Sequence, residues 1–161
     1  MGMRIGIGYD VHAFAPDREL VLGGVHIPHT QGLLGHSDAD VVVHAVADAL
    51  LSAARMGDIG KLFPDTDPRY AGADSLDLLE HVVAAITQAG FSIVDIDCVI
   101  AAQVPKLSPY RDGMRANIAA ACGLPVANVG LKATTTEHLG FVGREEGISA
   151  QAVALLEAPL W

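Results

Sequence analysis

The sequence has few of the residues on which several classes of protein depend. Its two cysteines, Cys98 and Cys122, show no C-x-x-C spacing, which fits a reducing compartment and leaves thiolates out of the expected metal chemistry. Lysine and arginine total 10 against 19 acidic residues, giving a formal net charge of -9. We therefore expect no nucleic-acid partner, because such a surface needs clustered positive charge.

Long hydrophobic runs are also missing. No stretch approaches the roughly 18 uninterrupted apolar residues of a membrane-spanning helix, so we expect no membrane partner. The N-terminal segment carries a single arginine and no extended apolar core, so we expect no signal peptide and a cytoplasmic protein. Half of the residues are nevertheless apolar, which favours a folded domain with a real core, and we expect one domain over residues 1–161.

Hydrophobic patterns alternate between strand and helix along the chain. They predict strands at 3–14, 91–103 and 128–137, a hairpin at 20–28, and helices at 36–57, 75–89 and 108–123. Residues 147–158 fit either type by periodicity alone. The fold class we predict is α/β, an α+β sandwich in which a single mixed sheet packs against helices, with a small N-terminal hairpin.

Helix start signals and loop composition add two expectations. Ser37 is the predicted cap of the first helix, with Asp40 at the capping-box position, and Ser108 is the predicted cap of the third. Residues 57–74 form a long polar segment rich in Gly, Pro and Asp, and a loop of that length in a compact domain indicates function.

The first predicted strand carries an unusual pair, Asp10 and His12. Residues i and i+2 of a strand project from the same face, roughly 6.6 Å apart along it, so one metal ion could bind both. On these two residues alone, a buried, hydrogen-bonded Asp–His pair is the favoured explanation.

His44, in the middle of the first predicted helix, shifts the balance towards a metal. Asp10, His12 and His44 together supply three ligands of the kinds zinc takes, and three protein ligands with an open fourth position are typical of a catalytic zinc. Asp40 and Asp48 share the helix face of His44, so either could bind its outer ring nitrogen, although Asp40 could equally favour the helix N-terminus.

A threonine run, Thr134 to Thr136, precedes Glu137 at the end of a predicted strand. β-Branched residues favour strands, so a plain strand end explains the run. The alternative is a row of hydroxyl and N–H groups for a phosphate, with Glu137 available for a hard cation.

Five segments carry a resemblance that spans almost the whole chain: "GYDVHAF", "GHSDADVVVHAVADALL", "GDIGKLFPDTD", "AQVPKLSPY" and "KATTTEHLGFVGREEGI". In order and spacing they resemble the 2-C-methyl-D-erythritol 2,4-cyclodiphosphate synthase family. The resemblance implies metal-dependent intramolecular phosphoryl transfer in non-mevalonate isoprenoid precursor biosynthesis. The substrate would be 4-diphosphocytidyl-2-C-methyl-D-erythritol 2-phosphate, and CMP would be released.

The same resemblance implies roles for individual residues. Asp10, His12 and His44 would bind one Zn²⁺ per chain, and Glu137 would serve a second divalent cation, Mg²⁺ or Mn²⁺, held mostly by the diphosphate. His36 and Thr135 would stabilise the transition state. The implied substrate-binding residues are Ser37, Asp58, Ile59, Gly60, Phe63, Pro64, Asp65, Thr66, Asp67, Ala102, Gln103, Val104, Pro105, Lys106, Leu107, Ser108, Thr134, Thr136, Phe141 and Arg144.

The implied contacts divide the substrate between two regions. Residues 58–67 would hold the methylerythritol part, and residues 102–108 with Thr134 would form the cytidine pocket. Phe141 and Arg144 would lie near a threefold axis, because the family is a homotrimer with active sites between subunits. The resemblance also favours a strand for residues 147–158. His138 departs from the lysine or other polar residue expected there.

Two other functions use the same residues. A metal-dependent phosphohydrolase would activate water and release a linear diphosphate instead of a ring. A non-enzymatic trimeric binding protein would need a closed structural zinc site, and the sequence offers no obvious fourth ligand.

Overall fold

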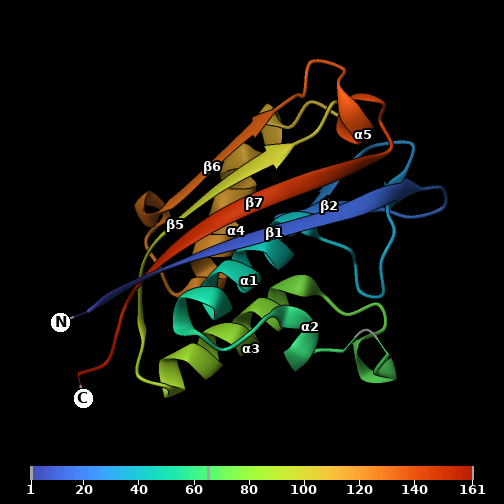
Figure 1. Cartoon of the computed structure of the whole chain (residues 1–161). Coiled ribbons are helices and arrows are strands. Elements are labelled where there is room, and N and C mark those ends of the chain that lie inside the picture. Colours follow the sequence, from blue (N-terminus) through green and yellow to red (C-terminus); the bar gives the residue numbers. More distant parts are fainter. Residues whose placement is uncertain (1, 65, 161) are drawn as a thin grey trace.

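The computed structural model describes residues 2–64 and 66–160. Its centre is a five-stranded sheet in the order β4-β1-β7-β5-β6, crossed on one face by helices (Figure 1). The strands are β1 (Met3–Ala15), β4 (Gly32–Leu33), β5 (Ser92–Ala101), β6 (Val129–Thr134) and β7 (Gly147–Glu157). β5 and β6 are parallel and the other neighbours are antiparallel. The predicted mixed sheet is confirmed, and residues 147–157 are a strand.

The helical layer has two levels. α1 (Val41–Ala54) packs on β1 and β7, α4 (Arg111–Cys122) packs on β6, and α3 (Ser75–Gln88) packs on both of these helices. The predicted hairpin is confirmed as β2 (Leu20–Leu22) and β3 (Val25–Ile27), a separate two-stranded sheet. In the described part of the chain, no helix combines the length and apolar character needed to cross a bilayer.

Glycines let α1 approach β1 closely. A Cβ on Gly6 would overlap the helix backbone at Ala49, and a Cβ on Gly8 would overlap it at Ala45. Their sequence neighbours Ile5 and Ile7 point to the opposite face and are about two-thirds exposed. Successive side chains of a strand alternate between faces, so Asp10 and His12 continue the row of Gly6 and Gly8 and face α1.

The first helix begins later than predicted. Its cap is Asp40, not Ser37, because the Asp40 side chain accepts a hydrogen bond from the Val43 N–H. The same buried carboxylate accepts N–H groups of Gly23 and Gly24 in the hairpin, at 2.9 and 2.7 Å. These long-range donors satisfy the buried charge and join the hairpin to the helix.

Several of the connecting segments contain short helices. The polar segment contains α2 (Ile59–Leu62) and η1 (Pro68–Tyr70), and the chain after β6 contains α5 (Gly140–Gly143). A 3₁₀ turn, η2 (Ser108–Tyr110), precedes α4, and η3 (Val126–Asn128) follows it. The prediction that Ser108 caps α4 is wrong, since Ser108 lies inside η2 and neither helix start has a side-chain cap.

Candidate functional site

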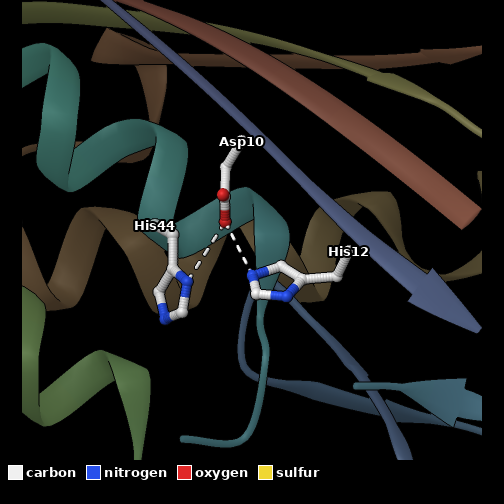
Figure 2. A group of neighbouring side chains, drawn as sticks. All are labelled: Asp10, His12 and His44. Carbon is white, nitrogen blue, oxygen red and sulfur yellow. Dashed lines mark hydrogen bonds and ion pairs between the residues drawn. The ribbon is translucent and has the colours of Figure 1, made fainter. Parts of the chain in front are cut away.

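Asp10, His12 and His44 converge where β1 crosses α1 (Figure 2). Asp10 Oδ2 lies 2.9 Å from His12 Nε2 and 3.2 Å from His44 Nδ1. One potential ligand atom from each residue falls within 4.8 Å of the others, and all three side chains are largely but not fully buried. The three residues that the sequence singled out as metal ligands therefore lie close enough together to hold one ion, and they are partly exposed to solvent.

The hydrogen-bond partner of His12 decides which of its nitrogens is available. Nδ1 lies 2.8 Å from the Leu34 carbonyl oxygen, which can only accept, so Nδ1 carries the hydrogen. In the neutral ring, the lone pair of Nε2 then faces Asp10 Oδ2. A lone pair and a carboxylate repel unless a proton or a metal cation lies between them, so this arrangement suits a cation.

The pKa values of the pair agree with this electrostatic picture. Burial raises the pKa of Asp10, but hydrogen bonds from His12 and His44 outweigh it and lower the value to about 2. Burial lowers the pKa of His12, but the hydrogen bond to Asp10 outweighs it and raises the value above normal. Asp10 is thus held as a carboxylate, the form that binds metals.

The outer nitrogen of His44 has partners other than those predicted. Nε2 lies 2.8 Å from Ser75 Oγ and 3.2 Å from Ser37 Oγ. Asp40 is committed to backbone N–H groups, and Asp48 accepts the N–H of Ile59 at 2.7 Å. The prediction that Asp40 or Asp48 holds this nitrogen is therefore wrong. Ser75 was missed because its position at the start of α3 resembles an ordinary helix start.

A cavity of about 380 Å³ opens beside the three residues. Its lining joins the triad to both the loop before α1 and the polar segment, and consists of Asp10, His12, Gly35, His36, Ser37, His44, Ile59, Gly60, Phe63, Pro64, Tyr70 and Leu78. Among these, Gly35, Tyr70 and Leu78 were not predicted. The Tyr70 ring packs edge-on against Phe63, with centroids 5.1 Å apart, and so shapes the cavity wall.

A second cavity, of about 390 Å³, lies at the ends of β5 and β6. It is lined by Ala102, Gln103, Val104, Pro105, Lys106, Leu107, Ser108, Ala133, Thr134 and Thr135. It shares no lining residue with the first cavity. One chain thus carries these two cavities apart from each other, one rich in potential metal ligands and one rich in hydroxyl and backbone groups.

Comparison with known proteins assigns the chain to a family. The model of the YgbB family matches residues 3–157. The chain belongs to the YgbB family. A 2-C-methyl-D-erythritol 2,4-cyclodiphosphate synthase of Paraburkholderia xenovorans (strain LB400) is 60% identical over 156 residues, covering 97% of this chain and 98% of the relative. One of Clostridioides difficile (strain 630) is 55% identical over 154 residues, covering 96% of each chain.

Solved structures share the fold of this YgbB protein. IspF of Plasmodium falciparum, solved as a CDP complex, has a TM-score of 0.86 at 33% identity, and the match covers 99% of this chain and 98% of that one. The bifunctional IspDF from Campylobacter jejuni has a TM-score of 0.94 at 43% identity. That match covers 98% of this chain but 42% of the bifunctional protein.

Many of the residues that the family resemblance implies for this YgbB chain line one or the other of the two cavities. Ser37, His36, Ile59, Gly60, Phe63 and Pro64 line the triad cavity, and the 102–108 run, Thr134 and Thr135 line the other. Asp58 caps α2, and Asp67 caps η1 and pairs with Arg69 at 2.7 Å. Thr66 lies between them without lining the cavity, and Asp65 falls outside the described residues.

Glu137 stands apart from the triad. It follows β6, and both it and His138 have left-handed backbone conformations, with φ of 54° and 63°. Such conformations are costly for residues other than glycine and are often found in functional loops. The turn is held by the His138 N–H, which donates to Gln103 Oε1 at 3.1 Å, and by the Thr136 hydroxyl, which donates to the Leu139 carbonyl.

The two residues expected near a threefold axis belong to α5 and its end. Phe141 is more than one-third exposed. Arg144 donates to Glu146 at 2.9 Å, so within one chain its charge is already paired.

Proposed function

We propose that this chain catalyses the conversion of 4-diphosphocytidyl-2-C-methyl-D-erythritol 2-phosphate to 2-C-methyl-D-erythritol 2,4-cyclodiphosphate with release of CMP. The chain is a lyase of the non-mevalonate route, as its relatives' names and near-complete coverage indicate. The observation that carries the chemistry is the convergence of Asp10, His12 and His44 on one side of a cavity large enough for a small phosphorylated substrate. We place the enzyme in the cytoplasm.

The triad is the site for one divalent ion, which we propose to be zinc. Two imidazole nitrogens and one carboxylate oxygen form a donor set that zinc prefers, and the open side leaves a position for substrate. When bound, such an ion neutralises phosphate charge and polarises phosphorus. Glu137 offers one carboxylate to a second ion, Mg²⁺ or Mn²⁺, whose other ligands would be substrate oxygens and water.

The reaction needs no protein nucleophile, because both reacting groups are in one molecule. An oxygen of the 2-phosphate forms a bond to the β-phosphorus, the bond from that phosphorus to the CMP oxygen breaks, and CMP leaves with the electron pair. The protein's main task is to fold the substrate so that these groups meet in line. The walls formed by Ile59, Phe63 and Pro64 also exclude water, which would otherwise hydrolyse the diphosphate.

His36 and Thr135 are proposed to stabilise charge on the transferring phosphoryl group. His36 lines the triad cavity, and its Nε2 lies 3.0 Å from the Asp67 carbonyl oxygen, which fixes the hydrogen on that nitrogen and orients the ring. Thr135 lines the other cavity. Both residues can act on one phosphoryl group only if the triad cavity of one chain and the Thr135 cavity of another meet as two half-sites, which supports a site shared between subunits.

A homotrimer would bring half-sites of neighbouring chains together. The outer face of β1 offers an apolar stripe for such an interface, since Ile5, Ile7 and Tyr9 are all more than half exposed. The nucleotide part of the substrate would then occupy the cavity around residues 102–108, where a cytidine could meet backbone groups and Lys106. Phe141 and Arg144 would face the neighbouring chains.

Product analysis tests this proposal. The purified protein, loaded with zinc and supplied with Mg²⁺, is incubated with the cytidine diphosphate substrate and followed by phosphorus NMR. We expect resonances of a cyclic diphosphate together with CMP. His44→Ala should abolish both, while His81→Ala, a change at an exposed position of α3, should not. A linear diphosphate as the main product would identify a hydrolase and refute the cyclase function.

A further inference from the structure

Two residues outside α1, Ser75 and Asp38, are linked by hydrogen bonds to the outer nitrogen of the His44 ring, Nε2. Ser75 is the first residue of α3 and is fully buried, and its Oγ lies 2.8 Å from His44 Nε2. Asp38, in the loop before α1, lies behind Ser75 and receives its hydroxyl hydrogen. The direction of these bonds determines which nitrogen of His44 is free.

Asp38 fixes that direction because an ionised carboxylate only accepts hydrogen bonds. Its oxygens accept the Ser75 N–H at 3.0 Å, the Asp40 N–H at 3.1 Å and the Ser75 hydroxyl. Since the Ser75 hydroxyl hydrogen points to Asp38, the Ser75 oxygen can only accept at its contact with His44. With a cation between His44 Nδ1 and the Asp10 carboxylate, which would otherwise itself accept a hydrogen from Nδ1, the hydrogen of the neutral His44 ring therefore resides on Nε2.

We propose that Asp38 and Ser75 are positioning residues that keep the hydrogen of His44 on Nε2 and so leave the Nδ1 lone pair facing Asp10. The inference rests on the proposed metal function of the triad. At His12 the same task falls to the Leu34 main-chain carbonyl, which presents the opposite nitrogen, Nε2. The two imidazoles thus offer different nitrogens to the same point, and only that of His44 is set by side chains.

Ser37 does not decide the orientation. Its Oγ lies 3.2 Å from His44 Nε2 and accepts the Ala39 N–H at 3.3 Å, but its own hydrogen can point towards or away from the ring. Ser75 has the shorter contact and a hydroxyl whose direction is fixed. The hydrogen-bonded sequence Asp38–Ser75–His44 is therefore the feature to test.

Asp38→Asn is the informative variant. Oδ1 of Asp38 accepts the Asp40 N–H and the Ser75 hydroxyl, and Oδ2 accepts the Ser75 N–H. If the one accepting oxygen of the asparagine amide keeps the Ser75 N–H, its NH₂ group takes the Oδ1 position and points at Ser75 Oγ. The Ser75 hydroxyl is then free to donate to His44 Nε2, which moves the ring hydrogen to Nδ1 and blocks the lone pair. Ser75→Ala removes the acceptor altogether.

Zinc affinity of the purified proteins, measured by competition with a chromophoric chelator, is the first readout. We expect Asp38→Asn and Ser75→Ala to bind zinc roughly 10- to 100-fold more weakly than the parent, the usual effect of losing an outer partner of a metal ligand. Asp74→Ala is the control, because Asp74 caps the same start of α3 at Leu76 without touching His44. Its affinity should stay within about twofold of the parent.

Nitrogen-15 NMR of the histidine rings is the second readout, on protein supplied with excess zinc. We expect the hydrogen of His44 on Nε2 in the parent and in Asp74→Ala, and on Nδ1 in Asp38→Asn. A parent with the hydrogen on Nδ1, a parent-like ring in Asp38→Asn, or an Asp74→Ala variant as weak for zinc as Ser75→Ala would overturn the proposal. A parent that binds no zinc would instead refute the metal function.

Discussion

Lys106 is the residue that brings positive charge to the cavity at the ends of β5 and β6. A phosphate of the nucleotide is the natural partner for a lysine ammonium group in a cavity lined mostly by neutral residues. Lys106→Ala should therefore weaken CMP binding by roughly 10- to 100-fold, the effect of losing a charged hydrogen bond. The zinc content should not change.

Isothermal titration calorimetry with CMP measures this effect, and metal analysis measures the zinc. Arg4→Ala, near the start of β1, removes a positive charge away from the cavity lining and is the control. Unaltered CMP affinity in Lys106→Ala would show that Lys106 is an ordinary solvated charge without a role in nucleotide binding.

The reactivity of the two cysteines, Cys98 and Cys122, tests how deeply individual side chains are buried. Burial raises the pKa of the Cys98 thiol to about 12 and that of Cys122 to about 12, and both side chains are nearly inaccessible. The reactive species is the thiolate. At pH 8 we expect almost no reaction with Ellman's reagent in the folded protein and two thiols per chain in guanidinium. Rapid reaction of the native protein would contradict the buried placement of these residues.

At the scale of elements, the site depends on how closely α1 lies on β1. Gly8→Ala would place a methyl group against the α1 backbone at Ala45, one residue from His44. Overpacking of this kind costs about 1–3 kcal/mol, and relief by moving α1 would separate His44 from Asp10. We expect a lower denaturation midpoint together with weaker zinc binding.

Gly113→Ala is the matched control for this substitution. Gly113 lies within α4, where an added Cβ would meet only the Val25 side chain, at 3.4 Å. Alanine is the better helix former by about 1 kcal/mol, so this variant should be as stable as the parent or more so, with unchanged zinc affinity. Chemical denaturation of both variants decides the matter, and a Gly8→Ala protein as stable as the parent would show that the close approach is dispensable.

Prediction from sequence succeeded where the determining contacts are local. The pairing of Asp10 with His12 follows from the two-residue period of a strand, and the helix at 75–88 follows from the helical spacing of its apolar residues. It failed at the start of α1, where Asp40 is held by the hairpin, and at Ser75, which lies 31 residues from His44. Both depend on contacts between distant segments, which no local pattern encodes.

At the scale of the whole molecule, the separation of the two cavities makes assembly part of the function. If a site combines the triad cavity of one chain with the Thr135 cavity of its neighbour, variants damaged in different halves should complement each other. His44→Ala and Thr135→Ala should each be inactive alone. Co-expressed with different affinity tags, they should form mixed trimers in which one of the three sites, about a third, contains two intact halves.

Activity of the doubly purified mixed protein measures this complementation, and light scattering checks that it is a trimer. A mixture of the two proteins purified separately and not allowed to exchange subunits is the control, and it should remain inactive. Mixed trimers without activity, or an active monomer, would show that the half-sites do not join across subunits.

The alternation of β1 has a consequence for how this strand can change over evolutionary time. Its even-numbered residues from Gly6 to His12 face α1, and its odd-numbered residues from Ile5 to Val11 are exposed. Inserting one residue beside Tyr9 would invert the parity of one half of the strand, because side chains alternate strictly between faces. The isoleucine side would then collide with α1, or Asp10 and His12 would turn away from His44. Homologues should therefore vary in length in their turns and hold the length of this strand constant.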